Sequence, residues 1–362
     1  MLRFLRPFAA FVVMFGATSF ALSSALPWPE VCQVRERLEY LAGETEGYDA
    51  VFVGSSAMYR SFDPERIDAL MAKRGIEFRS YNLGVPASRA WETDELLHAA
   101  MDAAGDRLKW VFIEPDDWGV GSERGNEDSY RFVFWHRPSA TIEAVRVAFE
   151  FDRPFVESVE EAWTHVRSAL HRATAYGAGG IIAREALGID APVPEYVAAA
   201  ERGGTIALDD DPDPSVEWRR RDFIDKSDEV YDYRVEKFIE RLGERRTAEP
   251  DATELVGAWV HDRQRREIEE RGAEAIYVVP PYLRPDRGLP AIVGTDHVGT
   301  VFDFAKPHRY PELYEKNNRW DVNHLNAAGA KAMSKAFVDE FAAHLRRLER
   351  ANGAPPDGVD PQ

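Results

Sequence analysis

The chain has 362 residues, of which 44% are hydrophobic and 30% are charged, the composition of a soluble globular protein. The formal net charge of −18 would repel a nucleic-acid backbone, and no basic patch follows the first residues, so nucleic acid is excluded as a partner. Cys32 is the only cysteine, which excludes an intramolecular disulfide and a zinc site built on thiolates. We expect no metal and no cofactor.

Residues 1–26 have the pattern of an export signal. Two arginines in MLRFLR precede an uncharged, apolar stretch from Pro7 to Leu26. This stretch is near the roughly 20 residues that a helix needs to cross a bilayer, and the basic start favours export of the rest of the chain. The small residues Ser23-Ser24-Ala25 allow cleavage. We favour a protein anchored by this helix over one that is cleaved and released, and either form would be periplasmic or extracellular.

Five short runs rich in valine, isoleucine and aromatic residues follow, each bounded by turn residues. We expect strands at Tyr48–Val53, Phe78–Leu83, Leu108–Ile113, Ala275–Val279 and Val301–Phe304. Asp63 and Pro64 open a helix that Gly75 ends, and no helix is expected between Gly54 and Asp63. The β-α-β-α-β order predicts an α/β fold: a flavodoxin-like three-layer sandwich with a mostly parallel sheet.

The alternation of strands and helices stops after the third strand. Aromatic-rich helical pieces and the acidic loop LDDDPDPS then predict an inserted helical subdomain. A last helix from Ala327 to Arg350 is expected to turn Phe337, Phe341, Leu345 and Leu348 inward. The predicted divisions are 27–47 as a linker and helix, 48–118 and 247–350 as the α/β domain, 119–246 as the insertion, and 351–362 as a disordered tail.

Polar groups gather where the predicted strands end. In an open parallel sheet, ligands bind beyond the carboxyl ends of the strands, where loops converge. Read as isolated features, these groups have ordinary structural explanations as caps and turn residues, and Asn326 is interpreted as the N-cap of the last helix. Four of them fall at one edge of the sheet: Gly54-Ser55-Ser56, Asn82-Leu83-Gly84, Glu114-Pro115-Asp116-Asp117 and the segment WDVNHLN.

The chemistry that needs such a set is acyl transfer through an activated serine. Serine becomes a nucleophile when a neighbouring base takes its proton, and histidine is that base near neutral pH. We predict Ser56 as the nucleophile and His324 as the base, with Asp321 orienting the imidazole. The backbone N–H groups of Ser56 and Gly84 are the predicted donors to the oxyanion.

These residues resemble the sequence blocks of the SGNH (GDSL-like) hydrolase superfamily, over about half of the chain. The likeness is to exported members that accompany membrane-bound O-acyltransferases in modifying bacterial surface polysaccharides. It implies Ser56 in the nucleophile position, a glycine at Gly84 that offers an oxyanion N–H, and Asp321 with His324 completing the triad. The third block departs, because Asp116 occupies the position of an asparagine, and an ionised carboxylate cannot donate to an oxyanion.

We therefore expect an exported serine esterase or O-acyltransferase that moves an acyl group, expected to be acetyl, to or from a surface glycan, with a membrane-bound O-acyltransferase as a possible partner. One alternative is an inactive SGNH-type scaffold that binds glycan or that membrane partner. Another is a metal-dependent hydrolase built on Asp296, His297, His308 and the Asp321–His324 pair, whose spacing matches no metal motif. His297 and His308 are also rival bases for Ser56. The sequence sets no oligomeric state.

Overall fold

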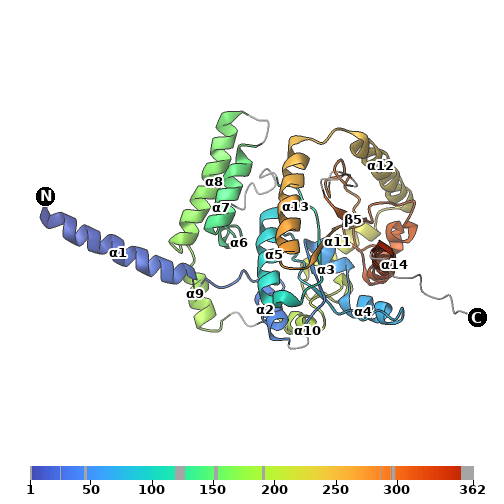
Figure 1. Cartoon of the computed structure of the whole chain (residues 1–362), viewed down its shortest axis with the longest axis horizontal. Coiled ribbons are helices and arrows are strands. Elements are labelled where there is room, and N and C mark those ends of the chain that lie inside the picture. Colours follow the sequence, from blue (N-terminus) through green and yellow to red (C-terminus); the bar gives the residue numbers. More distant parts are fainter. Residues whose placement is uncertain are drawn as a thin grey trace, which may run out of the picture.

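A parallel sheet of five strands organises the chain (Figure 1). The computed structural model describes residues 2–24, 26–44, 47–118, 127–150, 154–189, 192–285, 287–293, 295 and 298–351. The strands are β1 Ala50–Val53, β2 Ser80–Asn82, β3 Trp110–Ile113, β4 Glu274–Val279 and β5 Thr300–Asp303. Each lies inside, or within one residue of, a run predicted from the sequence. The predicted tail, 351–362, falls outside the described residues except for its first.

The strands lie in the order β2-β1-β3-β4-β5, and every neighbouring pair is parallel. This is the order of flavodoxin-like sheets, so the predicted α/β fold is confirmed. The chain adds β2 on one side of β1 and then adds β3 on the other side, so the strand order reverses between β1 and β3. Ligands of such sheets bind beyond the carboxyl ends of the strands at that point. The segments Gly54-Ser55-Ser56 and Glu114-Pro115-Asp116-Asp117 lie there.

Helices cover both faces of the sheet, and alternate strand residues serve the two layers. Phe52 of β1 faces one core, whereas Val51 and Val53 face the other. The Val51 side is covered by α2 (Val34–Gly43), α5 (Ala90–Ala104) and α13 (Ala252–Glu270). The Phe52 side is covered by α3 (Ser56–Ser61), α4 (Pro64–Ala72), α12 (Asp228–Thr247) and α14 (Ala327–Ala351).

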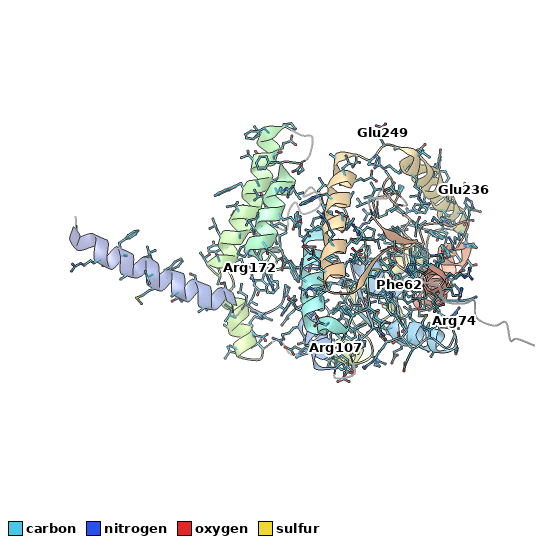
Figure 2. All side chains as sticks on the ribbon, viewed as in Figure 1. Phe62, Arg74, Arg107, Arg172, Glu236 and Glu249 are labelled. Carbon is cyan, nitrogen blue, oxygen red and sulfur yellow. The ribbon has the colours of Figure 1, made fainter. Side chains whose placement is uncertain are left out.

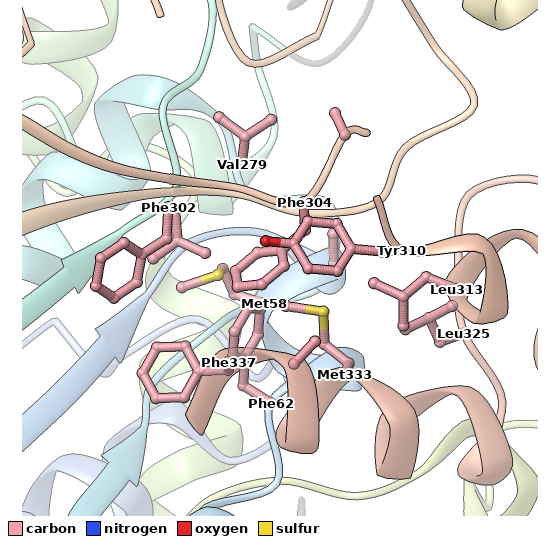
Figure 3. Packing of buried hydrophobic residues seen from close by; sticks show 14 of the residues in the cluster. Met58, Phe62, Val279, Phe302, Phe304, Tyr310, Leu313, Leu325, Met333 and Phe337 are labelled. Atoms are coloured by element: carbon pink, nitrogen blue, oxygen red, sulfur yellow. The ribbon is translucent and has the colours of Figure 1, made fainter. Parts of the chain in front are cut away.

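The short helix α3 was not predicted from the sequence. It begins at Ser56, where we had expected no helix before Asp63. Met58 and Phe62, one helical turn apart, point into the aromatic core together with Phe337 of α14 (Figure 3). Burial of both side chains favours a helical turn that no propensity signal reveals. This packing holds the turn after β1 firmly against the core.

Helix ends were predicted correctly at two places. The Asp63 side chain accepts a hydrogen bond from the Arg66 N–H and begins α4. The Asn326 side chain accepts from the Gly329 N–H in the first turn of α14. One residue of α14 was predicted wrongly: Leu348 is 38% exposed, because the residues that this helix buries end at His344.

The segment predicted as an insertion divides into two groups. Helices α6 (Tyr130–Phe134), α7 (Pro138–Ala148), α8 (Phe155–Ala173) and α9 (Gly179–Ala186) stand beside α5 and α13 (Figure 1). Val147 of α7 packs there against Trp91 and Val260. Helices α10 (Pro194–Glu201) and α11 (Ser215–Ile224) lie on the sheet domain instead. The core also includes Phe238 of α12, so the sandwich takes one of its covering helices from this segment.

The N-terminal helix α1 (Leu2–Ser24) is, within the described part of the chain, the one helix long and apolar enough to cross a membrane. Its candidate span, Arg6–Ser23, is almost wholly exposed. Figure 2 shows most of α1 projecting away from the rest of the chain, which it meets at its C-terminal end. An exposed apolar helix of this length is typical of a membrane anchor or of a signal sequence.

Candidate active site

Ser56 and His324 meet at the carboxyl edge of the sheet, although 268 positions separate them in the sequence. The Ser56 Oγ lies 2.8 Å from His324 Nε2. His324 Nδ1 lies 2.9 Å from both carboxylate oxygens of Asp321. The structure thus brings the three predicted residues into the order that an activated serine requires, from hydroxyl to imidazole to acid.

The Asp321 carboxylate is fixed by its neighbours. Its Oδ1 accepts hydrogen bonds from the N–H groups of Asn323 and His324, at 2.7 and 3.0 Å, and Arg219 Nη1 lies 4.0 Å from Oδ2. Burial opposes the charge, but the hydrogen bond and charge of His324, the Asn323 N–H and Arg219 outweigh it and lower the pKa of Asp321 to about 2. An ionised Asp321 favours a proton on His324 Nδ1, which leaves Nε2 free to accept the Ser56 proton.

A buried acid holds the turn that carries Ser56. Ser55 caps α3, since its Oγ accepts from the Ala57 N–H at 3.2 Å. Glu114, directly after β3, accepts from both the Ser55 N–H and the Ser55 hydroxyl, at 2.6 and 2.8 Å. A Cβ at Gly54 would lie 2.6 Å from Glu114 Oε2, so only glycine leaves room for this acid. The adjacent serines therefore have different tasks: Ser55 fixes the turn, and Ser56 presents the hydroxyl.

The two predicted oxyanion donors differ. Among the described residues, the Ser56 N–H has no acceptor. The Gly84 N–H donates to Asn82 Oδ1 at 2.8 Å, while Asn82 Nδ2 donates to the carbonyls of Met58 and Phe62. The Gly84 amide thus has an acceptor within the chain, and its role as an oxyanion donor stays a prediction. Through the bonds of its Nδ2 to these two carbonyls, the Asn82 side chain ties the end of β2 to α3.

Gly84 also matters because it lacks a side chain. A Cβ there would lie 2.5 Å from the backbone nitrogen of Tyr59 in α3. We expect Gly84→Ala to destabilise the protein by about 1–3 kcal/mol, the usual cost of overpacking. The control is Gly243→Ala in α12, where a Cβ meets nothing within 4 Å and the helix should gain about 0.5–1 kcal/mol. Thermal unfolding of both variants checks this, and equal melting temperatures would contradict it.

The polar segments that follow β1, β2 and β3 lie side by side at the edge of the sheet. The Val85 N–H donates to the Gly54 carbonyl at 2.8 Å, and the Glu114 N–H donates to the Val53 carbonyl at 3.0 Å. No family model matches this chain, and no curated protein matches it. The resemblance to the SGNH superfamily therefore stays a prediction. The residues that carry this resemblance lie at one edge of the sheet.

Asp116 faces an arginine rather than the triad. Its Oδ1 lies 3.6 Å from Arg287 Nη1 and accepts from the Asp117 N–H at 2.9 Å. Arg287 Nη1 also lies 3.7 Å from Glu114 Oε1. Burial raises the pKa of Asp116 and raises that of Glu114 to about 7, although Arg287 opposes both shifts. Asp116 therefore belongs to a buried acid pair around Arg287, and no hydrogen bond joins it to Ser56 or His324 in the described residues.

The raised pKa of Glu114 predicts a pH effect on stability. Because the pKa is about 7 in the folded chain against 4.5 for the ordinary group, the unfolded chain loses this proton first as the pH rises. Stability should therefore fall between about pH 4.5 and 7, by up to about 3 kcal/mol from this group. We expect Glu114→Gln to have a flatter profile of melting temperature against pH over that interval. Parallel profiles for the two proteins would assign the effect to other acids.

Sequence reasoning missed two buried arginines that support the site. Arg319 is fully buried and donates to the Val322 carbonyl at 3.0 Å and to the Pro281 carbonyl at 3.1 Å, which shapes the loop before His324. Arg37 of α2 is also buried and donates to the Gly84 carbonyl at 3.0 Å. No sequence pattern could have found them, because an arginine that binds backbone carbonyls from a distant segment looks in the sequence like a solvated charge.

The insertion also contacts the loop that carries Asp321 and His324. Arg220 of α11 donates to the Arg319 carbonyl at 2.6 Å, and the Trp320 indole N–H donates to the Val216 carbonyl at 3.1 Å. Asp209 accepts from the Ala327 N–H at 2.6 Å, at the start of α14. The second group of the insertion therefore helps to hold the histidine loop in place.

The described members of the metal alternative, His308, Asp321 and His324, form no metal site. Among the described residues, no group of three or more His, Cys, Asp or Glu side chains could hold a metal ion. Asp296 and His297 lie outside the described residues. His308 lies exposed in a turn, and the Ser56 hydroxyl is hydrogen-bonded to His324 instead. Of the described histidines, His324 is the one placed to act on Ser56.

Proposed function

We propose that this protein is a serine-dependent esterase or O-acyltransferase. The observation that carries the proposal is the 2.8 Å contact of Ser56 Oγ with His324 Nε2, backed by Asp321 on Nδ1. A hydroxyl, a base and an orienting acid in this order are the requirement for nucleophilic catalysis by serine. The resemblance to the SGNH superfamily, read from the same residues, points to the same chemistry.

The proposed reaction has two steps. Ser56 Oγ attacks the carbonyl carbon of an acyl ester while His324 Nε2 takes its proton, and the Ser56 N–H donates to the oxyanion. The bond to the leaving oxygen breaks, that oxygen receives the proton from His324, and an acyl-serine remains. A water or sugar hydroxyl, deprotonated by His324, then attacks the acyl carbon. The bond from that carbon to Ser56 Oγ breaks, His324 returns the proton to Ser56 Oγ, and the carboxylic acid or the new sugar ester leaves. Water makes the protein an esterase, and a sugar makes it a transferase.

The proposed substrate is an acyl ester, with acetyl as the expected acyl group, on a glycan outside the cytoplasmic membrane. Support comes from the apolar helix α1 behind a basic start, which fits an anchor or a cleaved export signal. A membrane-bound O-acyltransferase is the proposed partner, on the SGNH resemblance alone. Mass spectrometry of the mature N-terminus separates the two forms, since a start near Leu26 would rule out the anchor.

The direct test is capture of the acyl-serine. The purified full chain is incubated with p-nitrophenyl acetate, and release of p-nitrophenol is followed together with the mass of the peptide that contains Ser56. We expect an initial burst of p-nitrophenol and an added acetyl group on that peptide. If activated esters leave Ser56 unmodified across the neutral pH range, the proposal fails.

A second candidate, a binding scaffold of the same fold, is favoured by two observations. The Gly84 N–H is already bonded to Asn82, and the third sequence block supplies the carboxyl of Asp116 instead of an amide donor. Fewer oxyanion donors mean weaker stabilisation of the transition state, at about 10²–10³-fold in rate for each donor. Equal glycan affinity in wild type and His324→Ala, with no turnover in either, would favour the scaffold.

A further inference from the structure

A stripe of apolar side chains faces solvent along α8 and continues beyond α9. We define this outer stripe as Phe155, Val159, Trp163, Leu170, Leu187 and Ile189. Their exposed fractions run from 42% for Val159 to 73% for Phe155. Scattered apolar residues are normal on a protein surface, but a contiguous apolar face marks contact with a membrane or a protein.

Helix α8 has an unusual distribution of side chains. The residues that it buries are small or polar, namely Ser158, Glu161, Ala162, His165 and Ser168. Its large apolar residues recur at four-residue spacing from Phe155 through Val159 to Trp163, on a different side of the helix. A helix with water on its outer side normally shows the reverse pattern. The outer face of α8 is therefore suited to an apolar surrounding.

Most of the outer stripe lies on α8, a helix that touches the apolar helix α1. The two helices α1 and α8 are in contact, and α8 runs across the direction of α1 (Figure 1). Arg172, near the C-terminal end of α8, lies close to where α1 reaches this helical group (Figure 2). If α1 crosses a bilayer, α8 lies along the bilayer surface rather than through it. The ion pair of Arg35 with Glu185 ties α9 to the start of α2 and so to the sheet domain.

Charge argues against an electrostatic attachment. The chain carries a net charge of −18, and α8 itself has three glutamates against two arginines. An anionic lipid surface would therefore repel it on balance. What remains is insertion of apolar and aromatic side chains, and tryptophan in particular favours the level of the lipid headgroups.

We propose that the outer stripe lies in the headgroup region of the membrane that α1 crosses. The helical group α6–α9 then lies on the bilayer surface and supports the α/β domain. The occupant of this surface is lipid, and a neutral lipid surface suffices. The proposal depends on α1 as an anchor and not on catalysis by Ser56.

The test uses the full chain with Cys32→Ser, so that one introduced cysteine carries an environment-sensitive fluorophore. Val159→Cys and Trp163→Cys report on the outer stripe. Tyr233→Cys is the matched control, because Tyr233 is 62% exposed on α12, far from α1 (Figure 1). Each labelled chain is reconstituted into phosphatidylcholine vesicles, with or without a lipid that bears a nitroxide quencher near the headgroup.

We expect the nitroxide to quench the labels at 159 and 163 severalfold more than the label at 233, to the same extent at low and high salt. Agreement between the two stripe positions guards against distortion by one substitution. Equal quenching at all three positions would overturn the proposal. A blue shift at 159 and 163 without quenching would also overturn it, because the occupant would then be protein, such as a second copy of this chain.

Discussion

Ser56→Ala is expected to lower the turnover of an acetyl ester by at least about 10³-fold, because it removes the atom that forms the acyl intermediate. The Ser56 Oγ lies 2.8 Å from His324 Nε2, and the adjacent Ser55 hydroxyl is bonded to Glu114. Ser55 therefore has no route to substitute for Ser56. The measurement is steady-state release of p-nitrophenol, together with loss of the acetyl group from the Ser56 peptide.

Two controls accompany this variant. Ser139→Ala alters an exposed serine in the first turn of α7, outside the triad and outside the helices that hold its loops, and should retain wild-type turnover. His324→Ala should be about as damaging as Ser56→Ala, and the double variant little worse than either, because the two residues act as one unit. If Ser56→Ala turned over ester at the wild-type rate, the proposed function would be wrong.

Asp321→Asn is expected to lower kcat by about 10⁴-fold, the scale of this change in serine triads. An asparagine amide cannot hold the proton on His324 Nδ1, so the imidazole presents the wrong nitrogen to Ser56. The geometry makes this effect specific: both Asp321 oxygens lie 2.9 Å from Nδ1 in the wild type. Kinetics of acetyl-ester turnover measure the change, and a loss below tenfold would contradict the role.

The same variant should also change stability in acid. The pKa of Asp321 is lowered to about 2 from 3.8, so ionised Asp321 stabilises the fold above about pH 4, and this contribution is lost as the pH falls towards 2. The shift corresponds to about 2 kcal/mol. Melting temperatures between pH 5 and 2 should therefore fall less steeply in Asp321→Asn than in wild type, provided that both remain folded.

Much of the fold was readable from local patterns. The five strands are short apolar runs because both faces of the sheet are covered, and the caps at Asp63 and Asn326 follow from hydrogen bonds to residues three positions away. The meeting of Ser56 with His324 was also predictable in outline, because carboxyl ends of parallel strands share one edge. In each case the deciding interaction is local or is set by the sheet order.

Other features depend on contacts between distant segments, which no local pattern records. Helix α3 exists because Met58 and Phe62 find space in the core beside α14. In the sequence, Glu114 looks like an ordinary loop acid. Only the pairing of β1 with β3 brings its carboxylate within hydrogen-bond distance of the Ser55 N–H. Likewise, Asn82 takes the Gly84 N–H because the end of β2 lies against α3.

The sequence by itself determined the five strands, most of the helices, the apolar N-terminal segment and the candidate residues Ser56, Asp321 and His324. These follow from side-chain type and spacing along the chain. Only the tertiary structure decided which groups hold Ser56, His324 and Asp321 in place, and that the Gly84 N–H has an acceptor whereas the Ser56 N–H has none among the described residues. The physical reason is that packing in three dimensions decides which hydrogen-bond partners lie near a buried polar group. The same backbone amide would bond to a different acceptor if another group lay beside it.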